Sequence, residues 1–135
     1  AAGIALSRMR CFELTKDHQI LEELNIAIDT TISRSSFLNR SNASLYHGVL
    51  GNSVNLLYAG LSLEDDWLVN FVIDNGHGGI RKHYDRHVPW MNGIHDKEYI
   101  PELMLGFAGF GYAYLRLYKP KEVPMVLLIH PDERF

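Results

Sequence analysis

The 135-residue sequence predicts an all-α protein built as an array of helical hairpins. Three similar apolar segments each carry an early glycine, and these glycines are Gly3, Gly51 and Gly109. Their loose period of roughly 50 residues is typical of stacked helix pairs. Amphipathic segments lie between the apolar ones, so we expect inner helices that are covered by outer helices.

The inner helices are expected at 1–9, 49–60 and 107–118, because these segments are apolar on most sides. Cys11 follows the first of them and has no adjacent histidine or cysteine, so we expect a buried, inert thiol. A single cysteine excludes an internal disulfide framework. It fits a reducing compartment, and we therefore expect a cytoplasmic location.

The outer helices are expected at 16–32 and 62–76, each packed by one apolar stripe. Asp17 is the expected N-cap of the first helix. The second begins with Ser62 and Asp65 at a spacing that resembles a capping box. The residues of its expected packing stripe are Leu63, Trp67 and Phe71.

From Gly76 to Glu102 the sequence predicts a long ordered loop, because six glycines and prolines interrupt it. The outer helix before this loop is expected to end at Asn75-Gly76. The tail 123–131 is apolar and rich in β-branched residues, which predicts a short strand or an extended packing segment.

The charge and hydropathy of the chain exclude two classes of partner. The net charge is −3 and no basic stripe is present, which argues against nucleic-acid binding. The chain is 47% hydrophobic, but no apolar run approaches the roughly 20 residues that span a membrane. The first ten residues do not resemble a signal peptide, because their basic residues follow the apolar ones.

The stretch Ser-Leu-Tyr-His-Gly at 44–48 is the first candidate functional site, directly before the second inner helix. The imidazole of His47 can bind zinc. Tyr46 is a poor ligand, because an unperturbed phenol has a pKa of about 10 and zinc prefers sulfur or nitrogen donors. Alternatively, His47 bonds a backbone carbonyl and Tyr46 packs against the protein.

Two further patterns carry weaker signals. Four histidines, of which two are spaced for one helix face, suggest a metal site, although a solvated loop is an alternative; they are His77, His83, His87 and His95. Gly106 and Gly109 could belong to a phosphate loop, but no Lys-Ser/Thr pair follows. Close helix packing explains these glycines without a ligand.

The sequence resembles the lanthionine synthetase cyclase family, and it is most similar to the C-terminal cyclase domain of the class II bifunctional enzymes. "SLYHGVLGN" is similar to the family's Ser-Leu-Cys-His-Gly-x-x-Gly-Asn run. "PELMLGFAGFGYAYLRLYKPKEVPMVLLIHP" resembles the family's ending. "AAGIALSRMR" is similar to the stretch after the family's Trp-Cys-x-Gly motif. The resemblance covers 1–135 and is weakest from Gly76 to Glu102.

The resemblance implies a partial α/α toroid, in which 1–135 forms the C-terminal portion of one domain with about two and a half helical hairpins. The family adds cysteine thiols of a precursor peptide to dehydroalanine or dehydrobutyrine, using a zinc ion held by two cysteines and a histidine. His47 matches the histidine ligand, and Tyr46 stands in place of a cysteine ligand. The other cysteine ligand would precede Ala1, so we expect a fragment whose partner is the remaining N-terminal part of the domain.

Because Tyr46 replaces a zinc-ligand cysteine, the resemblance implies a cyclase with impaired activity. Two alternatives to this expectation remain. One is an inactive cyclase-like protein that binds a peptide or a partner. The other is a carbohydrate-active α/α toroid, which needs two placed carboxylates; the available ones are Asp65, Asp66, Glu98 and Glu102. In either case an open arc of hairpins exposes apolar inner-helix surface, so we expect the isolated chain to associate or to be marginally stable.

Overall fold

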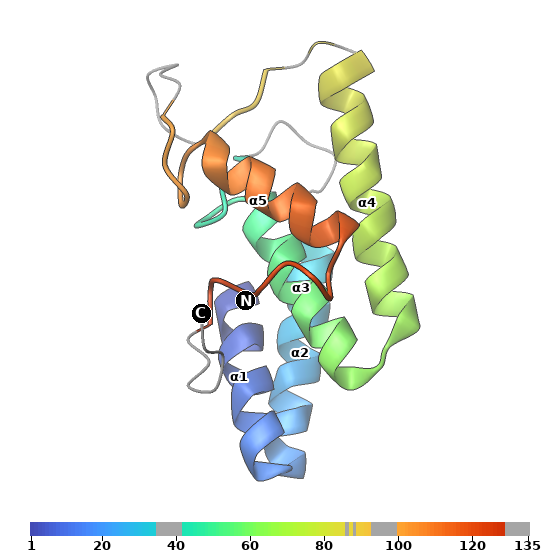
Figure 1. Ribbon diagram of the computed structural model, residues 1–135. Coiled ribbons are helices and arrows are strands. Elements are labelled where there is room, and N and C mark those ends of the chain that lie inside the picture. Colours follow the sequence, from blue (N-terminus) through green and yellow to red (C-terminus); the bar gives the residue numbers. More distant parts are fainter. Residues whose placement is uncertain (35–41, 86, 88, 93–99, 129–135) are drawn as a thin grey trace.

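The computed structural model describes residues 1–34, 42–85, 87, 89–92 and 100–128 (Figure 1). This part of the chain contains helices and no strand, which confirms the predicted all-α class. The helices are α1 (Ala2–Thr15), α2 (His18–Arg34), α3 (Val49–Leu63), α4 (Asp66–Asp85) and α5 (Phe107–Tyr118).

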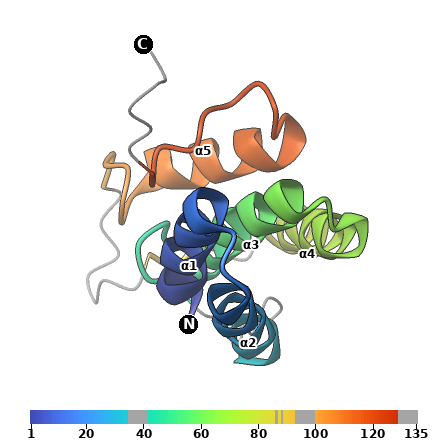
Figure 2. The same cartoon turned by 90° about the horizontal axis from the view of Figure 1, so that it is seen from below.

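The helices form two hairpins and one further helix. α1 packs against α2, and α3 packs against α4. α3 also contacts α1 and α5, so it occupies the centre of the arrangement, and Figure 2 shows it between α1 and α4 with α5 alongside. This order agrees with about two and a half hairpins of a helical array.

Burial separates α3 from the other predicted inner helices. Every residue of α3 from Ser53 to Gly60 is buried, as expected for an inner helix. In contrast, α1 and α5 each expose apolar side chains, among them Ile4, Leu115 and Tyr118, of which Tyr118 is 76% exposed. The exposed apolar surface that the sequence predicts is therefore present on α1 and α5, the two helices on either side of α3.

The outer helix α2 follows its predicted pattern. Its buried residues form one stripe at helical spacing, and they are Leu24, Ala27, Ile28 and Thr31. The Asp17 carboxylate accepts a 2.8 Å hydrogen bond from the backbone N–H of Gln19, as an N-cap does. The predicted cap and packing stripe are confirmed at Asp17, Leu24, Ala27 and Ile28, whereas Ile20 and Ile32, which were expected in the stripe, are half-buried.

The start of α4 differs from the prediction. Ser62 belongs to α3, and Asp65 alone caps α4 by accepting the N–H of Leu68 at 3.0 Å. Because the helix begins at Asp66, its buried residues are Leu68, Val72 and Gly76. The stripe predicted through Trp67 was wrong: that side chain is 63% exposed and stacks on Phe71.

α4 also continues beyond its predicted end at Asn75-Gly76 and reaches Asp85. Glycine costs about 1 kcal/mol in a helix interior, but tertiary packing can offset this cost. A Cβ at Gly76 would lie 2.8 Å from the Leu117 side chain of α5, so the missing side chain allows α4 and α5 to pack closely. The predicted loop from Gly76 to Glu102 therefore begins only after the helix.

The segment after α5 folds back onto that helix. The Tyr112 hydroxyl donates to the Pro124 carbonyl at 2.8 Å and accepts from the Val126 N–H at 3.1 Å. The buried Arg116 donates to the carbonyl of Val123, and Met125 is buried. Up to residue 128 this segment packs on α5 as predicted, but it does so through turns and irregular chain, including a bond from the Leu128 N–H to the Met125 carbonyl, and not as a strand or an extended segment.

Candidate functional site at two joined turns

A compact turn precedes α3. The Val49 N–H donates to the Asn42 carbonyl at 2.9 Å, and the Gly48 N–H donates to the Ser44 carbonyl at 3.0 Å. The fully buried Ser44 hydroxyl accepts the backbone N–H of His47 at 3.3 Å. A Cβ at Gly48 would overlap the backbone of Asn42 and Ser44, so this position needs glycine for space.

A second turn of the same construction precedes α5, 58 residues later. The Phe107 N–H donates to the Ile100 carbonyl at 2.9 Å, which repeats the bond from Val49 to Asn42. A Cβ at Gly106 would overlap the backbone of Ile100 and Glu102. The two turns are therefore structural repeats, and Gly106 is the counterpart of Gly48.

The next glycines repeat the same relationship. A Cβ at Gly51 would overlap the Leu45 carbonyl, and a Cβ at Gly109 would overlap the Leu103 carbonyl. Each helix thus carries a glycine in its first turn where it crosses the chain that leads into it. Gly106 and Gly109 are therefore needed mainly because the preceding backbone lies too close for a Cβ. This finding corrects the expectation that close packing between helices explains them. It also gives no support to a phosphate loop.

The two turns are joined directly to each other. The Tyr46 N–H donates to the Met104 carbonyl at 3.0 Å. Leu45 is buried, and a Cβ at Gly109 would lie 3.3 Å from its Cβ atom. A further bond of 2.6 Å, from the Ala43 N–H to the Met91 carbonyl, ties the first turn to the segment after α4.

Tyr46 and His47 lie at the outside of the first turn. Tyr46 is 63% exposed and His47 is also exposed, with their ring centroids 3.9 Å apart. Both residues directly precede the N-terminus of α3, where the helix dipole favours negative charge. The turn thus presents an accessible imidazole that can bind an anion, a metal ion or a thiolate.

The described residues do not complete a zinc site around His47. Structural and catalytic zinc sites use at least three protein ligands. Among residues that the structure describes, no three His, Cys, Asp or Glu side chains form a group that could hold a metal. Cys11 lies within α1, not after it, and is half-buried rather than buried as expected.

Most of the chain matches the model of a known protein family. Residues 1–128 match the family model described as Lanthionine synthetase C-like protein. The chain belongs to the lanthionine synthetase C-like family. Comparisons with curated proteins and with solved structures found no match. The all-helical hairpins of this LanC-like chain agree with the family assignment.

The described residues bring two histidines of the expected cluster, His83 and His87, to the lining of one pocket, but they form no group of three metal ligands there. His83 lies on α4 and stacks on Trp90, with ring centroids 3.7 Å apart. His87 lies beyond the end of α4 and has a φ of 50°, so the two do not share a helix face as their spacing predicted. His77 is exposed on α4, and His95 lies outside the described residues.

Sequence reasoning missed the residues that hold the first turn. Met104 and Met91 accept its backbone bonds, but neither was a candidate. The 58-residue interval between Gly51 and Gly109 aligns Tyr46 with Met104 and could have marked the second turn as a repeat of the first, but it gives no sign of Met91. No such signal could reveal that the two turns are hydrogen-bonded to each other.

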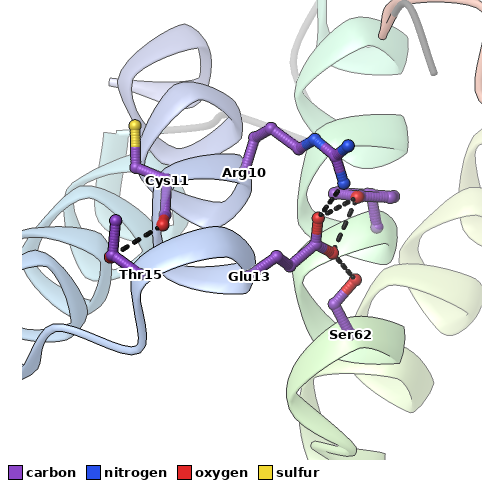
Figure 3. A network of polar contacts seen from close by, with 6 residues as sticks. Arg10, Cys11, Glu13, Thr15 and Ser62 are labelled. Carbon is purple, nitrogen blue, oxygen red and sulfur yellow. Dashed lines mark hydrogen bonds and ion pairs between the residues drawn. The ribbon is translucent and has the colours of Figure 1, made fainter. Parts of the chain in front are cut away.

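A polar cluster fixes α1 to α3 away from the turns. The Glu13 carboxylate accepts hydrogen bonds from Tyr58 at 2.7 Å, Ser62 at 2.9 Å and Arg10 at 3.0 Å, and Figure 3 shows Cys11 pointing away from it. Burial raises the pKa of Glu13, but these bonds outweigh it and the net pKa is lowered. Burial and the bond to Glu13 raise the pKa of Tyr58 to about 12.

Across the described part of the chain, none of the helices combines the length and hydropathy needed to cross a bilayer.

Proposed function

We propose that this chain is the C-terminal part of a thioether-forming peptide cyclase domain, like that of class II lanthionine synthetases, whose activity is impaired by Tyr46. The family match over residues 1–128 carries the proposal. The turn that presents His47 at the start of α3 supports it, because an exposed imidazole there can meet a peptide thiol. The peptide would be a precursor of lantibiotic type.

The reaction adds the sulfur of a cysteine to Cβ of dehydroalanine or dehydrobutyrine. A C–S bond forms, the thiol loses its proton, and Cα of the acceptor gains a proton, so atoms balance without another reactant. An unperturbed thiol has a pKa of about 8.5, and the thiolate is the nucleophile. His47, at the positive end of α3, can bind and orient this thiolate.

The adjacent Tyr46 is the reason for expecting impairment. A cysteine here would place sulfur and imidazole donors on neighbouring residues of one turn. The phenol is instead exposed and packs its ring against His47. We therefore propose weak or no zinc binding by the chain, and slow cyclisation at most.

A peptide-binding protein without catalysis is the second candidate. It is favoured by the same pair, since Tyr46 and His47 are both accessible while the described residues form no three-ligand group. A carbohydrate-active enzyme has less support. Asp65 caps α4 and Asp66 begins it, at the far end of α3, whereas Glu102 lies in the second turn near the start of α3, so these carboxylates are not paired. Glu98 lies outside the described residues.

A thiol count tests the proposal. Cyclisation leaves the peptide mass unchanged, so a linear peptide with one cysteine and one dehydroalanine would be incubated with the chain and then alkylated. Mass spectrometry measures the fraction that takes up the alkylating group. We expect slow thiol loss above the protein-free rate, faster loss with Tyr46→Cys, and none with His47→Ala. No excess loss with any form would overturn the cyclase proposal and leave peptide binding.

A further inference from the structure

Exposed apolar side chains gather around the two joined turns. Tyr46 is 63% exposed, Met91 50%, Met104 41% and Leu103 39%. Turn residues are normally Gly, Pro, Asn, Asp or Ser. A group of large apolar side chains at this place therefore indicates a surface that contacts something apolar. We name these four residues the apolar rim.

The backbone holds the apolar rim in one arrangement. Met104 accepts the Tyr46 N–H at 3.0 Å, and Met91 accepts the Ala43 N–H at 2.6 Å. Gly106 and Gly48 keep both turns tight, because a Cβ at either position would overlap backbone atoms. The backbone of Met104 and Met91 is consequently held against the turn that carries His47, which limits the ordering of the backbone needed on binding.

The two turns carry different types of side chain at equivalent positions. At the 58-residue interval Met104 is the counterpart of Tyr46, and Leu105 is the counterpart of His47. The first turn therefore presents the one imidazole, while the second presents apolar side chains at equivalent positions beside it. Methionine is flexible and polarisable, so it can adapt to apolar groups of different shapes.

We infer that Met104 is a specificity-determining residue that contacts an apolar side chain adjacent to the peptide thiol bound at His47. The inference rests on the proposed function, and it adds which peptides the site prefers. Cysteines flanked by apolar residues are bound better than cysteines flanked by polar ones. The bond from Tyr46 to Met104 sets the position of this contact.

Two fluorescently labelled peptides test the inference, Gly-Leu-Cys-Leu-Gly and Gly-Ser-Cys-Ser-Gly. Their Kd values would be measured by anisotropy with the unmodified chain. Burial of part of one leucine side chain corresponds to a preference of about five- to tenfold for the first peptide. We expect Met104→Ser to reduce this preference to about twofold or less, and Met104→Leu to retain it.

Leu14→Ser is the matched control. Leu14 is 71% exposed and lies at the C-terminal end of α1, away from the turns, so its substitution should leave the preference unchanged. Equal binding of both peptides, or an unaltered preference in Met104→Ser, would overturn the inference alone. His47→Ala should weaken both peptides equally; if neither peptide binds the unmodified chain, the proposed function fails together with the inference.

The alternative is that a second copy of the chain, and not a peptide, covers the apolar rim. Sedimentation of the same samples tests this alternative. We expect Met104→Ser and the unmodified chain to have the same oligomeric state. A dimer that dissociates in Met104→Ser and excludes the leucine peptide would overturn the inference, because the rim would then be an interface between copies.

Discussion

The backbone N–H of Tyr46 donates to the carbonyl of Met104 at 3.0 Å, and this bond joins two turns that lie 58 residues apart in the sequence. Each turn ends in a glycine that tolerates no Cβ, and the first turn leads into α3 while the second leads into α5. The candidate site at His47 thus depends on residues from both halves of the repeat, although only the first half carries an imidazole.

The glycine at the end of the second turn is expected to be essential for stability. Gly106→Ala places a Cβ against the backbone of Ile100 and Glu102, which cannot move as a flexible side chain could. We expect the free energy of unfolding to fall by about 2 to 3 kcal/mol, as for other overpacked positions. Chemical denaturation followed by circular dichroism measures this change.

Gly111→Ala is the matched control for this experiment. Gly111 also lies in the α5 region, but a Cβ there would meet nothing within 4 Å. Alanine is the better helix former, so we expect this variant to gain about 0.5 to 1 kcal/mol. Equal effects of the two substitutions would contradict the steric role of Gly106.

The cluster around Glu13 predicts a stability change in acid. The pKa of Glu13 in the folded chain lies below its ordinary value of 4.5, so its charged form favours folding. Its contribution is present above the unfolded pKa and is lost as the pH falls through the folded pKa. We expect Glu13→Gln to lower the free energy of unfolding by about 1 to 2 kcal/mol at neutral pH.

The difference between Glu13→Gln and the unmodified chain should shrink below a pH of about 4.5, as the carboxylate takes up a proton. Urea titrations at several pH values, read by tryptophan fluorescence, measure it. A difference that stays constant down to strong acid would show that the Glu13 charge does not fasten α1 to α3.

The contribution of Tyr58 to the free energy of unfolding is expected to have the opposite pH dependence. Burial and the bond to Glu13 raise its pKa from 10.0 to about 12, so the neutral phenol favours folding. This contribution is complete below pH 10 and is lost as the pH rises toward about 12. We expect Tyr58→Phe to cost about 1 kcal/mol at neutral pH, with the gap closing in alkali. An equal gap at all pH values would count against this bond.

Hydrophobic periodicity was sufficient to predict the fold class, because helices that pack by one stripe have a strong local signal. α2 is the clearest case, with its cap at Asp17 and three of its buried residues, Leu24, Ala27 and Ile28, foreseen. α4 shows the limit of this signal. Its glycines resemble a helix end, yet Gly76 lies inside the helix because Leu117 of α5 packs over it.

The candidate site was predictable only in part. The sequence drew attention to His47 and Tyr46 through their place before an apolar helix. It could not show that Met104 and Met91 hold this turn, since such bonds join distant parts of the chain and depend on backbone geometry rather than side-chain type. For the same reason the i, i+4 spacing of His83 and His87 was misleading, because α4 ends between them.

In the proposed function, Tyr46 takes the position of a zinc-binding cysteine that would complete a donor pair with His47. The most direct test is the zinc affinity of the unmodified chain, of Tyr46→Cys and of Tyr46→Cys with His47→Ala, each measured by competition with a chelating dye. We predict weak binding by the unmodified chain, a gain of about tenfold or more in Tyr46→Cys, and loss of that gain without His47. One tightly bound zinc per unmodified chain, or no gain in Tyr46→Cys, would contradict the account.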